Sequence, residues 1–194
     1  MNKIIKNALV LMAFSLVLGF VLGAVYKITE EPIAKANKLK EMAAYKVVFA
    51  DAYTFNELEV DAAKAEAMMA EAGFPDIVSG ALEAVDESNN VLGYVVTITT
   101  KNGTYGDGIV ITVGIQNDGT VNGISIVDKG DATIHKAYEP AFADQFKGQK
   151  VDKFEKGTNL NYDSVAGASV TADAVVNACN AAITYTNSLK GGAQ

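Results

Sequence analysis

The chain opens with one long apolar segment and continues as a longer part in which apolar and polar positions alternate. Residues 8–26 (ALVLMAFSLVLGFVLGAVY) carry no charged side chain. In a helix these 19 residues reach about 28 Å, close to the roughly 30 Å hydrocarbon thickness of a bilayer. The pattern predicts a transmembrane helix over 8–26, preceded by a short N-terminal tail, residues 1–7.

A cleaved signal peptide is the competing interpretation, because Lys3 and Lys6 supply the basic start that such peptides have. The apolar run is longer than the usual hydrophobic region of a signal peptide. Leu22 also stands two residues before Ala24, where a cleavage site needs a small side chain. An uncleaved anchor is therefore favoured. More lysines follow the span than precede it, so a plain count of lysines would put the rest of the chain inside the cell. Long domains cross the membrane largely regardless of such counts, so the side stays open.

Residues 27–50 are expected to form a juxtamembrane helix. Apolar side chains recur there at near-helical spacing, and Pro32 suits the first turn of a helix. Thr29 precedes it as an expected N-cap, with a lysine-rich, solvated face following.

Residues 51–194 show the pattern of a single α+β domain with antiparallel hairpins. Segments 80–85 and 91–99 flank the turn-forming sequence ESNN, and segments 109–115 and 120–127 flank NDG. Helical spacing predicts three helices, over residues 60–72, 134–147 and 171–189, the second of which contains Pro140.

Composition excludes several functions. The net charge is −7, and all basic side chains apart from the single His are lysines, so a nucleic-acid partner is not expected. With one Cys and one His, the chain offers no disulfide framework, zinc ribbon or iron–sulfur ligand set. Any redox chemistry must therefore come mainly from a bound group.

The segment with chemical content is DSVAGASVT, residues 163–171. Its small residues 166–168 let the backbone pass close to a bulky partner. Ser169 and Thr171 follow at the start of a predicted helix, where free N–H groups and the helix dipole attract an anion such as phosphate. On the residues alone, the commoner interpretation is that one hydroxyl merely caps the helix.

The string D-x-x-A-G-A-S-x-T resembles the flavinylation motif D-x-x-[ST]-G-A-[ST]-x-[ST] of the FMN-binding domain family. Other segments match that family in the same order along the chain. They are TEEPIA (29–34) after the apolar span, GY (93–94), YGDGI (105–109), VGIQNDG (113–119) and QFKG (145–148). The likeness covers nearly the whole chain and is closest to the G subunits of Rnf ion-translocating electron-transport complexes.

The resemblance implies that FMN is joined through its phosphate to the hydroxyl after the Gly-Ala pair. That hydroxyl is here Ser169, with Thr171 as the alternative acceptor and Gly167, Ala168 and Val170 as neighbouring cofactor-binding residues. The bond is a phosphodiester installed by a separate flavin transferase, and Asp163 is expected to be read by that enzyme or to cap the motif loop.

The implied role is an electron carrier without catalytic residues or a metal of its own. It would relay electrons within a ferredoxin:NAD⁺ oxidoreductase that drives Na⁺ or H⁺ translocation. The expected partners are the other Rnf subunits, the flavin transferase and the lipid bilayer, with the FMN domain on the outer face of the cell membrane. Two alternatives stay open: the C subunit of a Na⁺-translocating NADH:quinone reductase, and a membrane-anchored binding domain without flavin.

The sequence departs from the family pattern in two places. Ala166 stands where Ser or Thr is usual, and Ser169 stands where Thr is usual. The family's P-G-L-G loop is replaced by KGDATIHK (129–136), so no flavin contact is carried over to that loop. His135, within it, is interpreted as a surface side chain. Cys179 shares an apolar helical stripe and is interpreted as buried and structural.

Overall fold

The structure is a computed structural model that describes residues 3–100, 108–130, 136–155 and 162–191. The chain divides into two compact units, Met1–Glu41 and Met42–Gln194. Helix α1, Lys3–Val48, supplies the described part of the first unit, and its last turns belong to the second. Among the described residues it is the one helix long and apolar enough to cross a membrane, with a mean hydropathy of 2.6 over its most apolar window.

The expected helix start at Thr29 is wrong, because α1 continues through this region with Pro32 inside it. The Thr29 hydroxyl donates back to the carbonyl oxygens of Val25 and Tyr26, at 2.9 and 3.1 Å, instead of capping a new helix. A proline inside a helix costs about 3 kcal/mol, because it removes one hydrogen bond and crowds the preceding turn. The helix on both sides must outweigh this cost, since the exposed ion pair between Glu31 and Lys35, at 2.8 Å, adds only about 0.2–0.5 kcal/mol.

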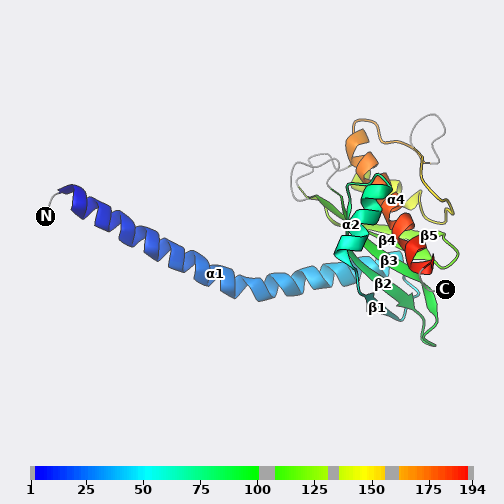
Figure 1. Ribbon diagram of the computed structural model, residues 1–194, viewed down its shortest axis with the longest axis horizontal. Helices are drawn as coiled ribbons and strands as arrows, with labels where there is room; N and C mark the ends of the chain where they lie inside the picture. The colour runs from blue at the N-terminus through cyan, green and yellow to red at the C-terminus, as the bar shows by residue number, and fades with distance from the viewer. Residues whose placement is uncertain (1–2, 101–107, 131–135, 156–161, 192–194) are drawn as a thin grey trace. The chain divides into compact units, whose positions relative to one another are not determined.

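The second unit is built on a five-stranded antiparallel sheet in the order β1-β2-β3-β4-β5, so each strand pairs with its neighbour along the chain (Figure 1). Both predicted hairpins are confirmed. Asn89 (φ 64°) closes the β2–β3 turn and Gly119 (φ 94°) closes the β4–β5 turn, and both adopt the positive φ that tight hairpin turns require. The strands are β1 Thr54–Leu58, β2 Ile77–Val85, β3 Val91–Thr100, β4 Ile109–Gln116 and β5 Val121–Asp128.

One face of the sheet is covered by α2, Ala62–Glu71, and α4, Ser169–Gly191 (Figure 1). Asp61 caps α2 by accepting hydrogen bonds from the backbone N–H groups of residues 63 and 64, both at 3.1 Å. Helix α4 is the central element of the core, and its buried positions include Val175, Cys179 and Ile183. This arrangement confirms the expected α+β class.

The other face of the sheet is covered by the end of α1 and the turn after it. Val48 and Phe49 are 0% and 3% exposed and pack over Gly93, Gly114 and Gly123, which lie on three adjacent strands. A methyl group at Gly114 would lie 2.9 Å from Val48 Cβ and 3.0 Å from a Phe49 ring carbon. The glycines therefore make room for this turn of chain.

The helix expected over 134–147 is wrong in extent. The described residues form a short 3₁₀ turn, η1 Lys136–Tyr138, and a separate helix, α3 Pro140–Asp144. Pro140 occupies the first turn of α3, because its ring blocks the hydrogen bond that a continuous helix would need there.

Candidate functional site

The DSVAGASVT segment leads directly into α4, which begins at Ser169, two residues earlier than expected. Ser169 is exposed, and its hydroxyl forms no hydrogen bond with any residue that the structure describes. The residue before the helix is Ala168, whose side chain cannot accept a hydrogen bond from the helix N-terminus. Among the described residues, the start of α4 therefore combines an unbonded hydroxyl with backbone N–H groups that receive no side-chain cap.

The two hydroxyls of the motif have opposite environments. Thr171 is only 5% exposed, because two helical residues turn the side chain by about 200° and direct it into the core. Val170, between them, is 63% exposed, which is unusual for a branched apolar side chain. A large partner can therefore reach Ser169 and Val170 in the folded domain, whereas it cannot reach Thr171.

Gly167 is present for its backbone conformation. Its φ is +78°, a value that side chains with a Cβ rarely adopt, and a Cβ built there would have no atom within 4 Å. The next residue, Ala168, is 2% exposed, and its N–H donates to the Val165 carbonyl oxygen at 3.1 Å. The chain thus turns sharply at Gly167, and open space lies beside the turn.

The start of the motif is held by a cluster of aromatic rings. Tyr162, 7% exposed, packs against Phe142 and Phe146 with ring centroids 6.3 and 5.5 Å apart. Phe154 joins the cluster through Phe146, at 4.9 Å. Burial, and secondarily the nearby carboxylate of Asp173, raises the pKa of Tyr162, so this phenol stays neutral.

A glutamine fixes the next residue. The Asp163 N–H donates to Gln145 Oε1 at 2.5 Å, and Gln145 Nε2 donates to the Asp163 carbonyl oxygen at 3.2 Å. The family resemblance includes the QFKG segment but gives Gln145 no role. Only the fold brings the two positions, 18 residues apart, together.

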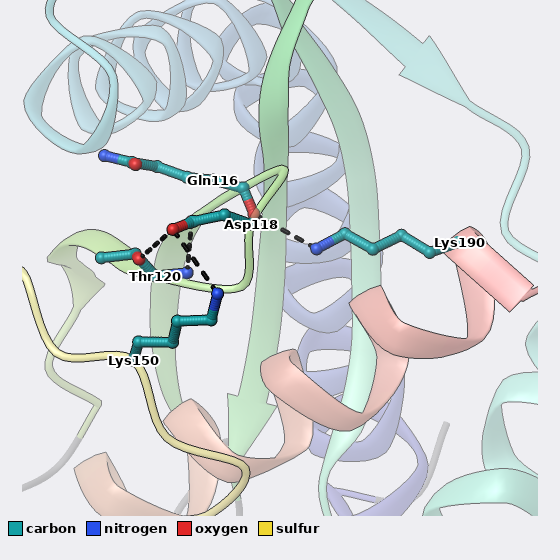
Figure 2. Close-up of polar contacts among 5 residues, drawn as sticks. All are labelled: Gln116, Asp118, Thr120, Lys150 and Lys190. Carbon is teal, nitrogen blue, oxygen red and sulfur yellow. Dashed lines mark hydrogen bonds and ion pairs between the residues drawn. The ribbon is translucent and has the colours of Figure 1, made fainter.

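The opposite end of α4 lies against the β4–β5 hairpin, about 32 Å from Ser169 along the helix. There Lys190 donates to the Gln116 carbonyl oxygen at 3.2 Å, as Figure 2 shows. Asp118 accepts hydrogen bonds from the Thr120 N–H and hydroxyl, both at 2.9 Å, and these lower its pKa. A pocket of about 740 Å³ opens beside Lys150 at this end. The polar groups here secure the hairpin turn and lie far from the motif.

The remaining candidates have structural roles or lie outside the described residues. Cys179 is fully buried, and its burial raises the pKa of its thiol far above the usual value, which confirms the structural interpretation. The residues that the structure describes hold no group of three or more His, Cys, Asp or Glu side chains that could bind a metal. His135 and the Tyr105–Asp107 part of the YGDGI segment lie outside the described residues.

Comparison with known proteins agrees with this architecture. Residues 104–184 match the FMN-binding domain family, and residues 1–48 match the RnfG N-terminal region. The match to the FMN-binding domain family thus follows the apolar N-terminal helix along the chain. A curated relative is the G subunit of the proton-translocating ferredoxin:NAD(+) oxidoreductase complex of Clostridium ljungdahlii. It is 26% identical over 180 residues, which are 90% of this chain and 86% of the relative. Together these matches confirm the predicted resemblance to Rnf G subunits.

Proposed function

We propose that this protein is a membrane-anchored electron carrier with FMN bound covalently to Ser169, acting as the G subunit of an Rnf-type ferredoxin:NAD⁺ oxidoreductase. One observation carries the proposal. Within the part of the chain that matches the FMN-binding domain family, the Ser169 hydroxyl is exposed at a helix start and makes no hydrogen bond with the described residues.

The site fits an FMN phosphate. A phosphodiester keeps one negative charge, and the N-terminus of α4 would stabilise that charge by about 0.3–1 kcal/mol. Gly167 leaves open space beside the acceptor, and the exposed Val170 offers an apolar contact to a flavin ring. When bound, FMN supplies the one- and two-electron redox chemistry, while the protein holds and orients the cofactor.

Attachment needs an activated flavin donor, because a simple phosphate monoester has no good leaving group. The Ser169 oxygen would attack the flavin-side phosphorus of a flavin dinucleotide held by the transferase. A new O–P bond forms as the pyrophosphate link breaks. The nucleoside monophosphate leaves, and the hydroxyl proton passes to a base. No oxidation or reduction of the flavin is involved.

The first described helix supports the anchoring part of the proposal. Its large apolar side chains between Ile4 and Tyr26 are all about half exposed or more, as expected for a surface that faces lipid. Residues 8–26 contain no charged side chain that could carry an ion, so coupling to Na⁺ or H⁺ would belong to partner subunits. We further propose that the FMN domain faces outward, in line with the family resemblance.

The match of residues 1–48 to the RnfG N-terminal region favours this function over the C subunit of a Na⁺-translocating NADH:quinone reductase. The match of residues 104–184 to an FMN-binding domain likewise favours it over an adaptor without flavin.

The test is to produce the full chain together with a flavin transferase, and to compare Ser169→Ala, Thr171→Ala and Ser164→Ala with the unchanged protein. Flavin fluorescence in a denaturing gel and intact mass report covalent attachment. We expect fluorescence from the unchanged protein, Thr171→Ala and Ser164→Ala, and none from Ser169→Ala. Ser164 is the matched control because it is also an exposed motif serine.

Ser169→Ala should change stability by less than about 0.5 kcal/mol, because this exposed side chain makes no hydrogen bond with the described residues. Unfolding therefore cannot account for a dark band. If Thr171→Ala is dark and Ser169→Ala fluoresces, the acceptor is Thr171. If the unchanged protein carries no flavin under these conditions, the covalent proposal is wrong.

A further inference from the structure

Two side-chain amides hold the two ends of the chain segment that leads into the motif. Asn180 on α4 accepts from the Phe154 N–H at 2.7 Å and donates to the Phe154 carbonyl oxygen at 3.0 Å. Gln145 makes the same pair of hydrogen bonds with Asp163, at 2.5 and 3.2 Å. Each amide binds the N–H and the C=O of a single residue, as a neighbouring β-strand would.

Gln145 is itself held firmly. It is the C-cap residue that follows α3, and its carbonyl oxygen accepts a hydrogen bond from the Gln149 side-chain amide at 2.6 Å. Phe146 beside it is fully buried. Its partner Asp163 follows Tyr162, whose ring packs on Phe146. The hydrogen bonds and the ring contacts therefore fix the same point of the chain by independent means.

The stretch between this point and the start of α4 is short. Ala168 is buried directly before Ser169, and its N–H donates to the carbonyl oxygen of Val165, which packs against the core. Only residues 164–167 lie between, and of these Val165 is half-buried while the rest are exposed. The path of the chain to Ser169 is therefore set by Asp163 at one end, and by Val165 and Ala168 at the other.

We propose that Gln145 is a positioning residue for flavin attachment, which holds the motif loop in the shape that the transferase accepts. This inference rests on the proposed covalent attachment at Ser169. The loop carries the motif residues that precede the acceptor, including Asp163 itself, so a transferase that reads the motif must read this loop. Gln145 acts on the reaction only through the backbone of Asp163.

The amide is needed because one side chain must both accept and donate. Gln145→Glu keeps the size and shape of the side chain and can still accept from the Asp163 N–H. A carboxylate cannot donate to the Asp163 carbonyl oxygen, and it places a negative charge against that oxygen. The substitution thus releases one half of the contact without opening a cavity.

Gln116→Glu is the matched control. Gln116 Nε2 donates to Asn122 Oδ1 at 2.7 Å, in the β4–β5 hairpin at the far end of the sheet. The control therefore loses one amide donor and gains one negative charge, as Gln145→Glu does, but away from the motif.

The experiment measures the initial rate of flavin incorporation into the full chain in detergent, with purified transferase and flavin dinucleotide, by intact mass. Amide hydrogen exchange of the unloaded protein is measured in parallel. A small displacement of reacting groups commonly costs about 100-fold in rate, so we expect Gln145→Glu to be at least about tenfold slower than the unchanged protein. Gln116→Glu should react at the unchanged rate.

We expect faster exchange in Gln145→Glu over residues 162–168, with β3 and β4 as protected as in the unchanged protein. A merely destabilised fold would instead exchange faster throughout. An unchanged rate in Gln145→Glu, or equal slowing in Gln116→Glu, would overturn the positioning role while leaving covalent attachment intact. Absence of flavin from the unchanged protein would instead overturn the attachment itself, and the positioning role with it.

Discussion

Adding one methyl group at Gly114 should weaken the domain, because the end of α1 packs directly on this glycine. In Gly114→Ala the new Cβ would lie 2.9 Å from both Val48 Cβ and the Val48 carbonyl oxygen. Both are rigid parts of a residue that is 0% exposed, so they cannot swing away as the end of a long side chain would. The Phe49 ring, at 3.0 Å, blocks the remaining direction.

The size of the effect follows from two opposing contributions. Overpacking of a tight core usually costs about 1–3 kcal/mol. Replacing glycine by alanine also restricts the unfolded chain, which favours folding by about 0.4–1 kcal/mol. We therefore expect a net loss of about 1–2 kcal/mol in the free energy of unfolding. For a domain of this size that corresponds to a fall in melting temperature of about 2–8 °C.

Gly80→Ala is the matched comparison. Gly80 also lies in a strand, β2, but a Cβ there would have no atom within 4 Å. Thermal unfolding of the full-length variants in detergent, followed by circular dichroism, should show Gly80→Ala at or slightly above the melting temperature of the unchanged protein. If Gly114→Ala is equally stable, the turn at Val48 does not pack on the sheet as described.

Two further outcomes follow from single side chains. The Cys179 thiol should resist alkylation at pH 8 in the folded protein and react after denaturation, because it is fully buried and its pKa is raised. Rapid labelling of the native protein, measured by mass, would contradict this expectation. The pKa of Asp86 is lowered from 3.8, mainly by hydrogen bonds from the Asn90 side chain and backbone. Its ionised form therefore stabilises the fold above about pH 4, and this contribution is lost as the pH falls through the lowered pKa. In acid titrations the difference in free energy of unfolding between the unchanged protein and Asp86→Asn should narrow below about pH 4. A difference that widens there would refute the stabilising role of the ionised Asp86 side chain.

The sequence predicts those helices, strands and turns that are determined by residues close together along the chain. The two hairpins followed from turn residues such as Asn89 and Gly119, which tolerate positive φ wherever they occur. The expectations that failed depended on context: whether Pro32 begins a helix or lies inside one is decided by the stability of the helix on both sides. Strand β1 was missed because it is an edge strand without a clear alternation of buried and exposed positions.

The candidate site divides in the same way. The motif drew attention to Ser169 and Thr171, but spacing could not rank them, because the exact start of α4 decides which one is buried. Gln145 was within a matched segment, yet its contact with Asp163 depends on the packing of the aromatic cluster around Phe146. Such long-range pairs have no periodic pattern along the chain.

The order of the elements, with α4 after all five strands, bears on when the cofactor can be added. The sheet is a meander of neighbouring strands, so its hairpins can form from local contacts as soon as they are synthesised. Helix α4 is synthesised after the strands, and its 13 buried residues become covered only when it docks on the sheet. Until then Thr171 is as accessible as Ser169. A transferase that acts on unfinished chains would therefore yield a mixture of two products. A transferase that acts on the completed domain would yield a single, uniformly labelled protein. The homogeneity of the product would therefore show whether flavin attachment comes before or after the docking of α4.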